Sequence, residues 1–90
     1  MEALNDRAVF KNGLQRWPDR PGLEICAVTE MFRRAIIWYI ETDTGNKNCH
    51  MLTEQEYIEI DGKKYTVADG ADRISAALEK EKIKKMLDRM

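Results

Sequence analysis

The chain lacks the motifs by which many enzymes and metal proteins are recognised. It has two cysteines but no C-x-x-C pair, and with one histidine in the whole chain a zinc site has too few ligands at useful spacing. Its five glycines have the spacing of neither a Walker loop nor a dinucleotide-binding loop. The sequence therefore predicts a protein that is not an enzyme and that uses no cofactor and no metal.

Long hydrophobic runs and a basic charge excess are absent as well. The longest apolar run is AIIWYI at 35–40, whereas a membrane-spanning helix needs about 20 residues. The N-terminal MEALND has neither the basic start nor the apolar segment of a signal peptide. A net charge of −1 lacks the basic footprint of a general nucleic-acid coat protein. We therefore expect a cytoplasmic protein with no membrane contact and with reduced cysteines.

The composition is that of a small folded protein. The 90 residues predict one domain over 1–90, and 43% hydrophobic with 34% charged residues is ordinary for a globular chain. A chain of this size buries a thin core, so pairing with a second copy is one way to gain stability. The profile is compatible with small accessory proteins of bacteria and phages, and by itself it assigns no function.

The clearest local signal is the segment EYIEIDGKKYTV at 56–67. Two alternating runs flank Asp61 and Gly62, and such a dipeptide is typical of a two-residue hairpin loop whose central residues both have positive φ. This turn sets a register in which Ile58 lies opposite Tyr65. The segment therefore predicts an antiparallel hairpin with one apolar face and one polar face.

A helix is predicted over about 71–89, with Asp69 as its N-cap. One side of this helix carries Ala71, Ile74, Ala77 and Leu78. The other side carries Ile83, Met86, Leu87 and Met90. One straight helix cannot place both groups in one small core. The second group is therefore either a frayed, exposed end or a surface that binds a partner or a second copy.

The middle of the chain predicts two strands, LEICAV at 23–28 and AIIWYIET at 35–42. The second run is apolar on both faces and so predicts a central strand covered on both sides. Because no glycine or proline separates the runs, a helix over 28–39 is the alternative, and residues 2–16 are open between helix and hairpin. The fold class is α+β: a small antiparallel sheet of about four strands, with the C-terminal helix packed on one face.

Two groups of reactive side chains favour structural roles. Cys49 and His50 are adjacent in a strand and so point to opposite faces, which disfavours a shared site. We expect Cys49 to pack as a small apolar residue and His50 to lie at a surface. The acidic run Glu54, Glu56, Glu59 and Asp61 is expected to be a solvated face rather than an acid–base pair.

Two surfaces remain as candidate binding sites. Trp17 precedes the turn PDRPG at 18–22 and is expected to be exposed, which would make it an anchor at a protein interface together with the late helix residues. The alternative is a surface for a nucleotide or a nucleic acid that uses Arg16, Arg20, Arg33 and Arg34 beside an aromatic side chain. The leading hypothesis is a non-enzymatic module that binds another protein or a second copy of itself.

Overall fold

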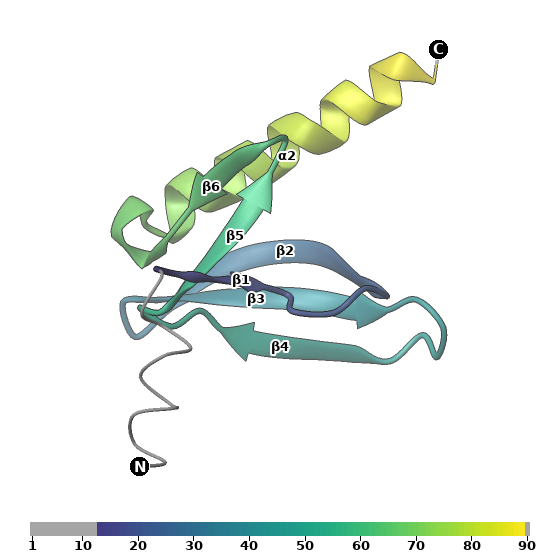
Figure 1. The fold of residues 1–90 in the computed structure, drawn as a ribbon. Coiled ribbons are helices and arrows are strands. Elements are labelled where there is room, and N and C mark those ends of the chain that lie inside the picture. Colours follow the sequence, from purple (N-terminus) through teal and green to yellow (C-terminus); the bar gives the residue numbers. More distant parts are fainter. Residues whose placement is uncertain (1–12, 90) are drawn as a thin grey trace.

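The computed structural model describes residues 13–89, which form two three-stranded sheets and a long C-terminal helix (Figure 1). The first sheet has the strand order β1 (Gln15–Trp17), β5 (Glu56–Ile60) and β6 (Lys63–Tyr65). The second sheet has the order β2 (Leu23–Met31), β3 (Arg34–Glu41) and β4 (Lys47–Met51). A short 3₁₀ helix, η1 (Val67–Asp69), leads into α2 (Ala71–Asp88).

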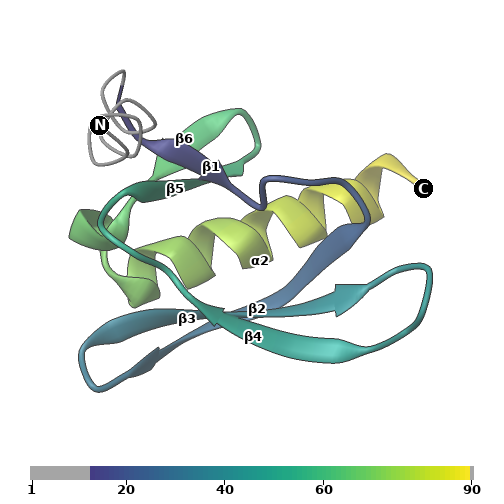
Figure 2. The same cartoon turned by 60° about the horizontal axis from the view of Figure 1, so that its bottom comes forward.

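Helix α2 lies between the two sheets and joins them into one core (Figure 2). The apolar side chains of its first two turns meet the inner faces of both sheets because alternation along β3 and β5 turns every second residue toward the helix. The buried cluster contains Trp17, Val28, Ala35, Ile37, Leu52, Ile58, Ile60, Tyr65, Ala71, Ile74 and Leu78. Among the described residues, no helix combines the length and the apolar character that crossing a membrane requires.

The α+β class, the hairpin and the C-terminal helix are confirmed. The register pairs Ile58 with Tyr65, and both side chains are buried on the inner face. The strands are divided between two sheets, since no ladder joins β4 to β5 in the described part of the chain. Strand β1 pairs with β5 in parallel, a contact between distant segments that no local pattern indicates. The alternative of a helix over 28–39 is wrong, since β2 and β3 form an antiparallel hairpin there.

Two further predictions are corrected or lie outside the structure. The N-cap of α2 is Gly70, and it makes no side-chain capping bond. Asp69 instead accepts the backbone N–H of Thr66 at 2.8 Å and so caps η1. The choice between helix and hairpin for residues 2–16 falls mostly on residues 1–12, which lie outside the described part of the chain, as does Met90.

Candidate functional site

The loop between β2 and β3 displays the most exposed large apolar side chain of the described residues. Phe32 and Arg33 form the whole loop, and their φ angles are +52° and +63°. Glycine and asparagine favour such angles, whereas a bulky side chain is strained there. Phe32 is 89% exposed. The long β2–β3 ladder therefore holds an aromatic ring in solvent on a backbone that its sequence does not favour.

Next to this tip, the outer side of the β2–β3–β4 sheet carries a group of apolar side chains, with Thr29 and Lys47 on the same side. Alternation sends Ala35 and Ile37 into the core, so Ile36 and Trp38 point to the opposite side. The Nε1–H of Trp38 donates to Thr29 Oγ1 at 2.7 Å, which places both side chains on that side. We use the name "outer face" for the side chains Met31, Ile36, Trp38, Cys49 and Met51.

The outer face remains accessible in the described part of the chain. Met31, Trp38 and Met51 are each more than a third exposed, and Cys49 is an exposed free thiol. Ile36 is buried, yet it lies outside the core cluster. The expectation that β3 is covered on both sides is therefore only partly met: β3 is central, but on its outer side Ile36 is buried while Trp38 is 38% exposed. Apolar surfaces of this kind are typical of interaction sites.

The last turns of α2 form a second exposed apolar surface. The final buried residue of the helix is Leu78, and the helix continues past the β5–β6 hairpin in both views (Figures 1 and 2). Ile83, Met86 and Leu87 are all more than half exposed. These residues follow the i, i+3, i+4 spacing of a single stripe, as the sequence indicates. We call these three residues the helix stripe; Met90, the fourth member of the group predicted from the sequence, lies outside the described residues.

Trp17 does not belong to either surface. The expectation that it is exposed is wrong: it is 7% exposed and forms part of the core. Its ring stacks on His50 with centroids 4.9 Å apart and meets Tyr39 edge-on at 5.3 Å. The turn after it does not expose it, because β1 is an edge strand whose last side chain points between the sheets.

His50 and Glu56 form a half-buried polar pair beside Trp17. The Nε2–H of His50 donates to Glu56 Oε1 at 2.9 Å, and the N–H and hydroxyl of Thr53 donate to the same oxygen at 2.9 Å each. Burial raises the pKa of Glu56, but these hydrogen bonds together outweigh burial and hold its pKa below the ordinary value. Glu56 is therefore not part of a solvated face. The pair fastens β4 to the start of β5, and among the described residues no cluster suits a metal ion.

The four arginines do not form one surface. Arg16 and Arg20 precede β2, and Arg33 and Arg34 follow it, so the two pairs are separated by nine strand residues, roughly 30 Å. Arg20 pairs with Glu41 at 3.3 Å, and Arg16 approaches Glu59 at 4.0 Å. The structure thus contradicts a joint surface that also includes Trp17.

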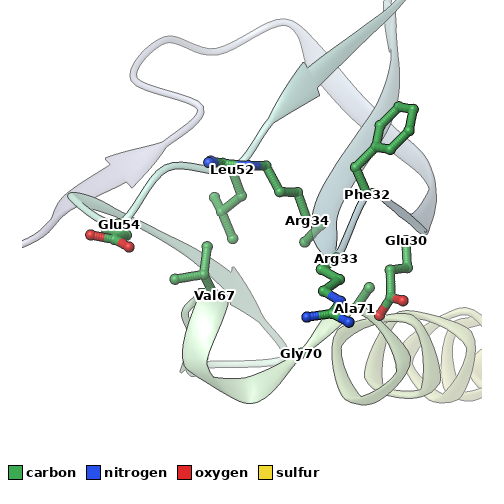
Figure 3. A pocket seen from close by; sticks show the side chains of 10 residues that line it. Glu30, Phe32, Arg33, Arg34, Leu52, Glu54, Val67, Gly70 and Ala71 are labelled. Carbon is green, nitrogen blue, oxygen red and sulfur yellow. The ribbon is translucent and has the colours of Figure 1, made fainter.

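Arg33 and Arg34 line an open concavity of about 390 Å³ at the start of α2 (Figure 3). Leu52 and Val67 line its apolar side, while the guanidinium of Arg33 and the carboxylate of Glu30 point toward the first turn of the helix. The ring of Phe32 points away from that helix (Figure 3). The positive end of a helix next to guanidinium groups favours anions, although Glu30 and Glu54 at the rim oppose this.

Comparison of the chain with protein-family models, with curated proteins and with solved structures gives no match. The candidate sites therefore rest on the geometry described above. Sequence reasoning found the helix stripe from its spacing. It noted Phe32 only as the aromatic side chain beside Arg33 and Arg34, and it missed the outer face. The signal for the outer face was present in the doubly apolar alternation of 35–40, which we interpreted as burial on both sides.

Proposed function

We propose that the protein is a non-enzymatic interaction module of the cytoplasm that binds another protein or a second copy of itself. The observation that carries the proposal is the display of Phe32, 89% exposed on a loop with two consecutive non-glycine residues at positive φ. A backbone of this kind costs about 1–2 kcal/mol per residue. Such strain is concentrated at functional sites, where binding of a ligand is a reason to keep it.

The two exposed apolar surfaces support the same proposal. The outer face continues from Phe32 through Met31, and methionine side chains adapt to partners of irregular shape. The helix stripe offers the i, i+3, i+4 pattern by which helices dock in apolar grooves or pair with each other. When a partner buries them, a few anchor residues of this kind supply most of the binding energy of a protein interface.

The proposal is tested by comparing the wild-type protein with a matched loop variant as baits in a capture experiment. The double substitution Phe32→Asn and Arg33→Gly gives the loop residues that suit its φ angles, so the fold is retained while the aromatic ring is removed. After chemical crosslinking, we expect the wild-type bait to capture a partner chain or a second copy of itself, and we expect the loop variant to capture neither. A triple variant with Ile83, Met86 and Leu87 changed to lysine tests the helix stripe in the same way.

The proposal is contradicted if the wild-type protein is a monomer at every concentration and captures no partner chain that either variant loses. Loss with the triple variant alone would place the interface on the helix stripe. Loss with the loop variant alone would place it on the β2–β3 tip.

A second candidate function is binding of a nucleotide or nucleic acid at the concavity beside α2. It is favoured by the position of Arg33 and Arg34 at the N-terminal end of a helix without a side-chain cap. Charge reversal at both arginines should abolish such binding, and the affinity of the wild type should fall steeply with salt. Binding to single-stranded oligonucleotides that survives the reversal would rule it out.

A further inference from the structure

The four sheet edges of the described structure differ in how they are protected against pairing. Edge strands β1 and β6 have three residues each, and very short edges resist the addition of a strand. Strand β2 carries an irregularity between Ile25 and Ala27, and the ammonium of Lys82 donates to the carbonyl of Cys26 there. Both features block the edge of β2. Strand β4 has five residues, a regular register and no proline.

The free backbone groups of β4 follow from its register with β3. The N–H of Leu52 donates to the carbonyl of Ala35 at 3.0 Å, so these two residues form a hydrogen-bonded pair. In an antiparallel ladder such pairs alternate with pairs that are not hydrogen-bonded. Asn48 and His50 therefore use their backbone groups on β3. The N–H and C=O groups that point away from β3 belong to Lys47, Cys49 and Met51.

Two of these residues, Cys49 and Met51, belong to the outer face, and alternation places Lys47 on the same side. Cys49 lies across from Trp38, and Met51 across from Ile36, both on the side away from the core. A strand added at this edge would thus continue an apolar surface rather than end it. Among the described residues the only ladder partner of β4 is β3. An edge with these properties recognises another strand through main-chain hydrogen bonds.

We propose that two copies of the chain pair through their β4 strands, antiparallel and related by a two-fold axis at Cys49. This inference rests on the proposed function, because it names the partner as a second copy. Cys49 is the middle residue of Lys47–Met51, so an axis there gives every residue of the strand a partner. The interface is self-complementary, as a two-fold axis requires.

Charge and side-chain type fit this register. Lys47 lies opposite Met51 of the second copy, and the two Lys47 residues are separated by four strand positions, about 14 Å. No like charges are therefore directly opposed. The two β2–β3–β4 sheets become one six-stranded sheet, and the apolar outer faces of both copies meet across the axis.

Cysteine crosslinking tests the register. Opposed residues of a hydrogen-bonded pair have Cα atoms about 5.5 Å apart, a separation that a disulfide spans. Cys26→Ser leaves Cys49 alone, and Cys49→Ser leaves Cys26 alone; both thiols are exposed, so the two variants are matched. With diamide as the oxidant that takes up the two hydrogens, we expect the Cys26→Ser protein to form a covalent dimer and Cys49→Ser to remain uncrosslinked. Equal crosslinking of both variants, or none in Cys26→Ser, overturns the proposal.

Sedimentation equilibrium tests the edge itself. Cys49→Pro removes an N–H that points away from β3, which leaves the ladder of the monomer intact. Cys49→Lys places like charges on the axis and needs no change of backbone. We expect dimers for the wild type and Cys49→Ser, and monomers for Cys49→Lys and Cys49→Pro. A wild-type monomer, or a Cys49→Lys dimer, contradicts the inference.

These results are distinguishable from a failure of the proposed function. A dimer that survives Cys49→Lys but dissociates when the helix stripe is changed to lysine overturns the β4 interface and still supports an interaction module. A wild-type monomer that binds a partner, and loses it with the Phe32 loop variant, also overturns the β4 interface and still supports an interaction module. A wild-type monomer that loses no partner with any variant contradicts both proposals.

Discussion

The chain builds the same turn twice, once from residues that favour it and once from residues that do not. Asp61 and Gly62 close the β5–β6 hairpin with φ angles of +53° and +81°. Phe32 and Arg33 close the β2–β3 hairpin with φ angles of +52° and +63°. In each case two residues with positive φ join strands in register. The difference lies in what holds each loop in place.

The Asp61 loop is supported by its own residues and by α2. The backbone N–H of Asp61 donates to Glu81 Oε2 at 2.8 Å, and the carboxylate of Asp61 lies 3.4 Å from Lys84 Nζ. The Phe32 loop depends instead on the strands that lead into it, whose inner side chains Val28, Ala35 and Ile37 are fully packed. Burial of side chains along a long strand pair can thus impose a turn that the residues of the loop do not favour. The residue types in such a loop can then be selected for binding rather than for turn formation.

The largest effect is expected when the residues of the Phe32 loop replace those of the Asp61 loop. Changing Asp61→Phe and Gly62→Arg puts two bulky residues at positive φ and removes the contact with Lys84. The short β6 strand offers little burial to offset this. We expect the free energy of unfolding to fall by about 3 kcal/mol, measured by urea denaturation. A loss below about 1 kcal/mol would show that loop chemistry matters little in this fold.

The reverse exchange should stabilise the protein. Phe32→Asn with Arg33→Gly relieves strain at two positions, partly offset by the flexibility of glycine in the unfolded chain. We expect a gain of about 1–2 kcal/mol, which for a domain of this size raises Tm by about 4–8 °C per kcal/mol. Differential scanning calorimetry measures it. Arg34→Gly, one residue outside the loop, is the control and should lower Tm, because glycine weakens a strand. A loop variant no more stable than the wild type contradicts the strain argument.

These two loops also show how far the sequence determines the structure. The Asp61 hairpin and its register are predictable because the loop residues and the strand alternation agree. The Phe32 loop is not, because MFRR carries no turn signal and only the pairing of complete strands selects it over a helix. The helix stripe was predictable from spacing within one element. The burial of Trp17 was not, because it depends on β1 joining β5 and on the ring of His50.

A smaller effect is expected from the contact between α2 and the favourable loop. Glu81→Ala leaves the N–H of Asp61 to water and removes the i, i+4 pair with Lys85. We expect the free energy of unfolding to fall by about 1 kcal/mol in urea denaturation. Glu79→Ala, on the exposed side of the same helix, is the matched control and should stay within about 0.5 kcal/mol. Equal losses would mean that α2 does not support the loop in this way.

The smallest effect concerns the pH dependence of stability. It is expected only for the β5–β6 hairpin, because β5 begins at Glu56, and among the described residues the Phe32 loop has no comparable hydrogen-bonded carboxylate. Hydrogen bonds from Thr53 and His50 outweigh burial and lower the pKa of Glu56 in the folded state. The ionised Glu56 therefore contributes to the free energy of unfolding at pH values above the ordinary glutamate pKa of about 4.3. This contribution is lost as the pH falls through the lower pKa that Glu56 has in the folded protein. We expect part of the acid loss of stability to vanish in Glu56→Gln and to persist in Glu59→Gln, measured by urea denaturation between neutral and acidic pH. Equal pH profiles in the two variants would mean that the His50–Glu56 pair does not link β4 to β5 in solution, and that the acid sensitivity arises elsewhere in the chain.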